Sequence, residues 1–132
     1  MDIFIITLIC LAAFHFIYQD VVLPSIHMSL RNKFFRLRDD LRMLKISGDT
    51  AAEEDAYPII QEGINNFINS LPSLTITFHA ELRALRHRDP ELRARVKRRV
   101  AVLKNIRSEK LKEIFDESNS VLRDAFLANV GG

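Results

Sequence analysis

The sequence predicts an all-α protein with one N-terminal transmembrane helix followed by a small cytoplasmic bundle of four to five helices. Three observations lead to this fold class. The chain begins with an apolar stretch of about 20 residues, the length that crosses a bilayer as a helix. Apolar residues in the rest of the chain recur mainly at helical spacing. Residues 74–79 alternate in polarity like a strand, but no other segment offers a strand partner.

The apolar stretch predicts a transmembrane anchor over residues 1–23. Residues 3–18 contain no Lys, Arg, Asp or Glu, and apolar residues resume after Gln19 and Asp20. Asp20 lies near the end of the stretch, where its carboxylate can reach the headgroups. A cleaved signal peptide is an alternative, but the chain starts without a basic segment. A buried core helix is another alternative. A helix that is apolar on every side must be surrounded by other helices, and the remaining, mostly amphipathic chain is too short to surround it. The polar residues of the anchor are His15, Gln19 and Asp20.

Basic residues after the anchor predict its orientation. Residues 31–38 carry four basic side chains and no acidic one, whereas Asp2 is the only charged side chain before the apolar stretch. The positive-inside rule then leaves the N-terminus outside and the rest of the chain in the cytoplasm, at the cell inner membrane or another membrane. The single cysteine, Cys10, lies inside the anchor and offers no disulfide framework that would contradict this placement.

Residues 24–48 are expected to form a juxtamembrane amphipathic helix. Pro24 is expected to end or kink the membrane helix, and Ser25 to cap the next one. Apolar residues then recur at spacings of three and four until Gly48, which is close to the period of a coiled-coil seam. Another helix, from this chain or a sister chain, must cover such a stripe. The predicted self-association seam consists of Leu30, Phe34, Leu37, Leu41 and Leu44.

Residues 49–132 are expected to form a cytoplasmic helical domain. A capping box at Thr50–Glu53 precedes a helix that starts at Pro58 and closes at Pro72. The apolar residues expected to share one face of this helix are Ile60, Ile64, Phe67, Ile68 and Leu71. We also assign residues 74–79 to a helix, because Leu74, Phe78, Leu82 and Leu85 share one helical face.

The C-terminal part of this domain reads as helix from residue 90 to about 128, with at most a weak point near Ser108. Asp89 is the expected N-cap of this helix and Pro90 its first residue.

Charge is sorted along this domain. Residues 39–69 carry seven acidic and two basic side chains, whereas residues 81–112 carry twelve basic and four acidic ones. On a helical wheel the basic segment has a narrow apolar stripe flanked by cations, which favours docking beside an anionic neighbour. That neighbour could be an acidic helix of this chain or a sister subunit, anionic lipid, or a protein partner; nucleic acid is not expected. The candidate contact residues are Arg93, Arg95, Lys97, Arg98 and Arg99.

No motif in the chain specifies a reaction. His87-Arg88-Asp89 matches the first letters of the protein-kinase catalytic loop, but the rest of the kinase pattern is missing. The four histidines do not have the spacing of a zinc site, and no nucleophile elbow or phosphate-binding loop occurs. We therefore expect no cofactor, no metal and no catalysis.

The leading functional hypothesis is a single-pass, non-catalytic interaction or regulatory protein that forms homo-oligomers and recruits a partner. A membrane-perturbing or channel-like effector, whose cytoplasmic domain senses a signal, is the alternative. It depends on the polar residues of the anchor. An enzyme with an active site between subunits is a further alternative without positive support.

Overall fold

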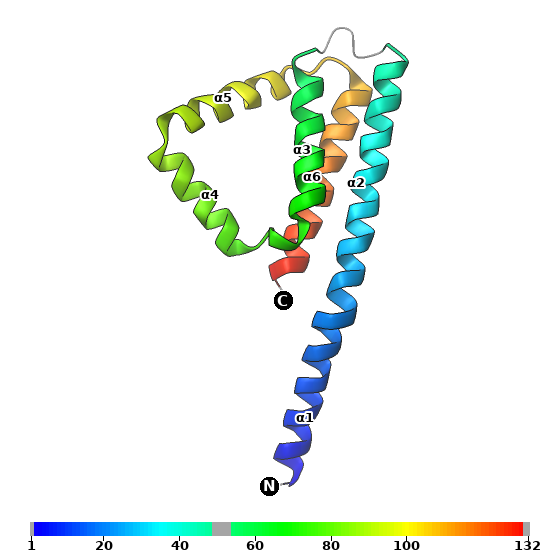
Figure 1. The fold of residues 1–132 in the computed structure, drawn as a ribbon, viewed down its shortest axis with the longest axis vertical. Coiled ribbons are helices and arrows are strands. Elements are labelled where there is room, and N and C mark those ends of the chain that lie inside the picture. Colours follow the sequence, from blue (N-terminus) through cyan, green and yellow to red (C-terminus); the bar gives the residue numbers. More distant parts are fainter. Residues whose placement is uncertain (1, 49–53, 131–132) are drawn as a thin grey trace.

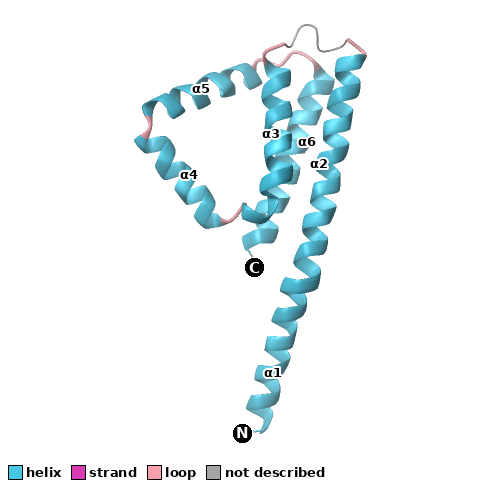
Figure 2. Cartoon of the chain, viewed as in Figure 1, coloured by secondary structure: helices cyan, strands magenta, loops and turns pink. Residues whose placement is uncertain are grey.

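The computed structural model describes residues 2–48 and 54–130, and within these ranges the chain forms helices and short connections without any strand (Figure 2). The predicted all-α class is confirmed. The capping box expected at Thr50–Glu53 lies outside the described residues. The elements are α1 (Asp2–Ile17), η1 (Tyr18–Val22), α2 (Leu23–Ile46), α3 (Ala56–Ser70), η2 (Leu71–Ser73), α4 (Ile76–Arg88), α5 (Pro90–Lys104) and α6 (Glu109–Val130).

The helix does not end at Pro24, because α1, η1 and α2 form one continuous rod (Figure 1). Proline lacks an N–H, and its ring collides with the carbonyl four residues earlier in a regular α-helix. The chain accommodates Pro24 by widening into one π-helical turn just before it, where the Leu23 N–H bonds to the Tyr18 carbonyl five residues back. Ser25 caps no new helix; its hydroxyl donates to the Val21 carbonyl at 2.7 Å.

The predicted bundle of four to five helices is smaller in the structure, because only α2, α3 and α6 pack together, as a three-helix bundle. Helices α3 and α6 run antiparallel to α2 and therefore parallel to each other (Figure 1). Every apolar residue predicted on one face of α3 packs in the core, because that face meets α2 and α6. The largest completely buried side chains are Phe34, Leu37, Leu41, Ile64, Leu71 and Leu111.

Two parallel helices need a connection that returns along the full length of the bundle. Here α4 and α5 form that connection, which we call the arm (Ile76–Lys104). Their 13 and 15 residues correspond to about 20 and 22 Å of helix, whereas α3 is about 22 Å long. The connection is about twice as long as the distance it must cover, so it bends outward between α4 and α5 (Figure 1). The residue between these two helices is Asp89. None of the described side chains in the arm is buried.

Side-chain caps define the start of the last three helices. As predicted, Asp89 is the N-cap of α5, where its Oδ1 accepts from the amides of Glu91 and Leu92 at 2.9 and 3.1 Å. Thr75 and Ser108 accept in the same way from the amides three residues later. The expected weak point near Ser108 is a complete break between α5 and α6, so residues 90–128 are not one helix.

Helix α3 starts earlier than the sequence indicated, because Ala56 rather than Pro58 is its first residue. Ala56 and Tyr57 are both buried against the core, so the earlier start of the helix is stabilised by packing.

Candidate functional site

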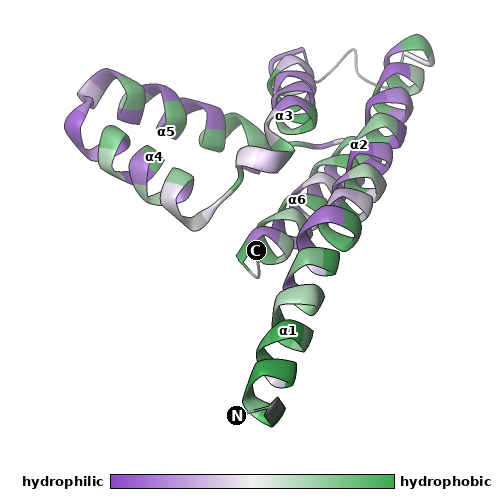
Figure 3. Ribbon diagram, turned by 60° about the horizontal axis from the view of Figure 1, so that its bottom comes forward, coloured by the Kyte–Doolittle hydropathy of each residue, from purple (hydrophilic) through white to green (hydrophobic). Residues whose placement is uncertain are grey.

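The apolar N-terminal part of the rod projects from the bundle and is exposed along its length (Figure 3). Near the N-terminus, the helix that runs to Ile46 contains a window long and apolar enough to cross a membrane. None of this window is buried in the structure. A core helix of a soluble protein would instead be mostly surrounded by other elements.

The three polar residues predicted within the anchor lie together on the rod. His15 and Gln19 are four residues apart and therefore share a helical face, and Asp20 follows directly. All three are exposed, and Gln19 and Asp20 belong to the π-helical turn. The structure thus gathers these residues at the end of the apolar stretch that is nearest the bundle.

The predicted self-association seam is occupied within the chain. Its five residues form the buried face of α2, and they pack against the apolar faces of α3 and α6. Phe34 also makes a tilted ring contact with Phe67 of α3, with 5.6 Å between the ring centroids. Self-association through this seam remains a prediction, and it would require α3 or α6 to leave α2.

The five predicted contact cations lie on α5, and all five are exposed. One of them, Arg99, forms an ion pair with Glu62 of α3, with 2.7 Å between guanidinium nitrogen and carboxylate oxygen. An acidic helix of the same chain is one of the anionic neighbours that the charge pattern allowed for the basic segment. The arm as a whole contains nine Lys or Arg and three Asp or Glu residues, which gives a net charge of +6.

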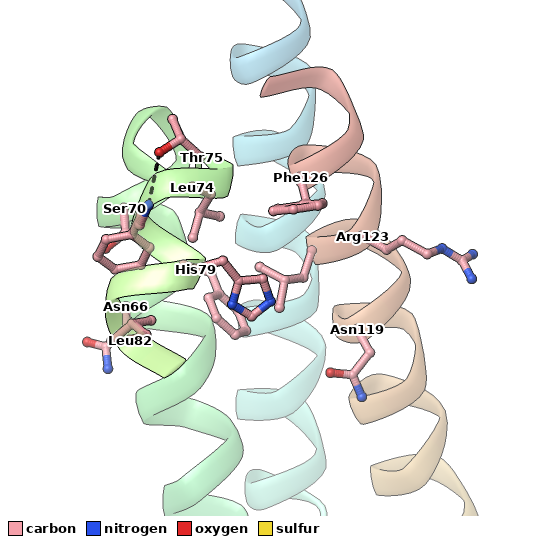
Figure 4. A pocket seen from close by; sticks show the side chains of 12 residues that line it. Asn66, Ser70, Leu74, Thr75, His79, Leu82, Asn119, Arg123 and Phe126 are labelled. Carbon is pink, nitrogen blue, oxygen red and sulfur yellow. Dashed lines mark hydrogen bonds between the residues drawn. The ribbon is translucent and has the colours of Figure 1, made fainter. Parts of the chain in front are cut away.

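The structure also forms an apolar hollow of about 540 Å³ between α3, the start of the arm and α6 (Figure 4). Its walls come from side chains that lie far apart in the sequence. The lining residues are Asn66, Phe67, Ser70, Leu74, Thr75, Phe78, His79, Leu82, Asn119, Leu122, Arg123 and Phe126. In Figure 4 the His79 ring lies among apolar side chains, whereas the Arg123 guanidinium points away from them.

A second hollow, of about 450 Å³, adjoins the first and shares two residues with it. The shared residues are His79 and Phe126, whose rings contact edge to face with 5.5 Å between centroids. Arg83 and His87 add polar nitrogens to this second hollow, and two alanines complete it. None of the described residues that line either hollow is Asp or Glu.

Asn129 fixes the end of the bundle where these hollows lie. Its amide nitrogen donates to the carbonyl oxygens of Leu71 and Leu74 at 2.9 and 3.0 Å, and its carbonyl oxygen lies 2.6 Å from His27 Nε2. One side chain on α6 therefore joins α2 to the segment that leads into the arm. This arrangement fixes where α4 starts relative to α6.

Neither hollow was predicted from the sequence. The helix expected from residue 74 begins only at Ile76, so Phe78 and Leu82 lie on α4 and Leu74 lies before it. The sequence did not indicate which element these apolar side chains face. That element is α6, whose Phe126 comes more than 40 residues later. Aromatic residues on two amphipathic helices were the available signal. To predict that these aromatic residues pack together, one would need to know that α6 runs parallel to α3.

Among the described residues, no group of three or more His, Cys, Asp or Glu side chains is placed to hold a metal ion. The chain matches no protein-family model, no curated protein and no solved structure.

Proposed function

We propose that this chain is a single-pass membrane protein that presents a non-catalytic interaction module, the cationic arm, to an acidic protein partner in the cytoplasm. In this proposal α1 is the anchor and the three-helix bundle is the support. The four basic side chains of residues 31–38, just after the apolar stretch, favour the cytoplasmic placement.

The observation that carries the proposal is the unburied arm. A net charge of +6 is concentrated on two helices that bury none of their described side chains. Three apolar side chains are also exposed between the cations, namely Leu82 at 44%, Leu85 at 52% and Val100 at 42%. Cations around exposed apolar groups suit a partner helix with an acidic rim and an apolar face.

The position of α5 favours a protein over lipid as its contact. Helix α5 approaches α3 at Glu62, which lies eight residues, or about 12 Å of helix, before the end of α3 on the α1 side. The Debye length at physiological ionic strength is about 8 Å, so attraction to an anionic bilayer is largely screened there. A soluble acidic partner can approach α5 directly, so its attraction to the cations is not screened over this distance.

Photo-crosslinking in native membranes tests the partner. A photoreactive residue at exposed Ala94 in the arm should give protein adducts that a residue at Met43, 65% exposed on α2, does not give. Arg95→Glu with Arg98→Glu should remove the adducts. The matched pair Arg42→Glu with Lys112→Glu, which makes the same charge change on the bundle, should retain them. Adducts with lipid alone, or equal adducts from both positions, would contradict the proposal.

A separate experiment tests the anchor and its orientation. After Cys10→Ser, a Met43→Cys variant carries one exposed thiol on the bundle. The protein should stay with the membrane at alkaline pH, and an impermeant thiol reagent should reach residue 43 only from the cytoplasmic side. Release at alkaline pH would contradict the anchor, and labelling from the other side would reverse the orientation.

A further inference from the structure

We propose that the two adjoining hollows together bind one single-chain anionic lipid, of which a long-chain fatty acid is the simplest example. The acyl chain lies in the larger hollow between Phe67, Phe78 and Phe126. The head group lies in the smaller one, where Arg83 supplies the charge and His79 and His87 supply ring nitrogens for hydrogen bonds.

The lining of the larger hollow fits a hydrocarbon chain. Small-molecule sites commonly measure about 300 to 1,000 Å³ and combine apolar walls with a few polar groups. The hollow, at about 540 Å³, lies in this range, and aromatic or leucine side chains from three elements line it. Its polar groups are mainly amides and hydroxyls.

Charge complementarity selects the head group. Because no described lining residue of either hollow is acidic, a carboxylate or phosphate would meet no like charge there. A neutral head group would lose the interaction with Arg83. The shared rings of His79 and Phe126 lie where the two hollows meet, so one elongated molecule can reach both.

The volume favours a lipid over a helix of a partner protein. A helix with its side chains is about 10 Å across, so two turns occupy roughly 850 Å³. The larger hollow holds less than this. One acyl chain needs only a narrow channel, which the hollow provides.

The site also lies near the proposed anchor. Phe126 precedes Asn129 by three residues, or about 4.5 Å of helix, and Asn129 bonds to His27. His27 follows the end of the apolar stretch at Leu23 by about 6 Å. A lipid that leaves the bilayer surface therefore has a short path. This source of the ligand depends on the proposed anchor, whereas the shape and charge of the hollows do not.

Tryptophan fluorescence tests this proposal directly, because the chain contains no tryptophan. Phe126→Trp in the full chain, held in an amphipathic polymer, places one reporter at the hollow. A fatty acid brominated in the middle of its chain should quench it saturably, and unlabelled palmitate should restore the signal. Met43→Trp, on exposed α2 surface, is the matched control and should show no saturable quenching.

Two further comparisons separate charge from apolar contact. Arg83→Gln in the reporter chain should raise the half-saturating concentration about two- to fivefold, the size expected for one exposed ion pair. Arg42→Gln should leave it unchanged. A brominated alcohol of equal length should bind more weakly than the acid. Phe78→Trp serves as a second reporter if Phe126→Trp loses helicity.

Three results would overturn the proposal. Equal, unsaturable quenching at residues 126 and 43 would mean simple partition. Equal binding of alcohol and acid would remove the anionic head group. Saturation by an acidic amphipathic peptide, without any effect of the fatty acid, would assign the hollow to a protein. Because the polymer-held chain needs no bilayer, these results are independent of the membrane-extraction and crosslinking outcomes.

Discussion

The bundle and the arm are both helical, but only the bundle has a core. Helices α2, α3 and α6 and Leu71 of η2 contribute the buried residues, whereas the described residues of α4 and α5 contribute none. The arm carries a net +6 charge and its apolar residues remain partly exposed. The difference shows that amphipathic periodicity predicts a helix but does not by itself predict that the helix is packed.

Topology explains the difference. Three helices already cover one another's apolar faces, so the connection between α3 and α6 is not needed to close the core. It is held mainly at its two ends. Asn129 fixes the segment before α4, and the Arg99–Glu62 ion pair with the partly buried residues Val102 and Leu103 fixes α5 against the bundle. Between these points the ring contact of His79 with Phe126 joins α4 to α6, and the rest of the arm depends on its own caps.

The largest expected effect comes from removing a core side chain. Leu37→Ala deletes a completely buried group and should lower the free energy of unfolding by about 2 to 5 kcal/mol. Leu85→Ala in the arm should cost less than about 1 kcal/mol, because that side chain is 52% exposed. Denaturant unfolding of the purified full chain measures both. Equal losses would mean that the arm shares the core.

Breaking the connection between arm and bundle should have a smaller effect. Asn129→Asp removes both donors to the Leu71 and Leu74 carbonyls and places a carboxylate beside them, with an expected loss of about 1 to 3 kcal/mol. Asn69→Asp makes the same charge change at an exposed position and should be nearly neutral. Thermal unfolding compares the two variants. Equal midpoints would show that Asn129 does not hold the arm.

Within the arm, the Asp89 cap should control how well α5 is formed. Asp89→Ala removes the acceptor of two amide hydrogen bonds and should cost the local helix about 1 kcal/mol. Asp55→Ala is the control, because Asp55 precedes α3 without a side-chain capping bond. Amide exchange in residues 91–96 should accelerate only in the first variant. No acceleration there would mean that α5 is held by other contacts.

Two glycines in the bundle should give effects of similar size to the Asp89 cap but of opposite sign to each other. Gly48 has φ +79° and no atom within 4 Å of the position that a Cβ would take, so Gly48→Ala should lose about 1 kcal/mol from backbone strain alone. Gly63 lies within α3, where an added Cβ meets Phe67 at an ordinary 3.9 Å. Gly63→Ala should therefore gain up to about 1 kcal/mol. Unfolding midpoints that shift in the same direction for both variants would contradict these two predictions.

The sequence predicted the local features better than the packing. The apolar faces of α2, from Leu30 to Leu44, and of α3 could be predicted, because apolar residues repeat at helical spacing in both. The Asp89 N-cap could also be predicted, because capping depends on residues that are adjacent in the sequence. The continuation of the helix through Pro24 could not be predicted, because it depends on a π-helical turn that has no sequence signature in this chain. The hollow near Phe126 depends on long-range helix direction.

Amide hydrogen exchange of the full chain in lipid nanodiscs tests the central claim most directly, namely that an anchored, closed bundle presents an unpacked arm. Amides of α2, α3 and α6 should exchange close to the rate set by global unfolding, and those of α1 should be protected by the bilayer. Amides of α4 and α5 should exchange orders of magnitude faster. Protection of α4 and α5 equal to that of the bundle would contradict the account.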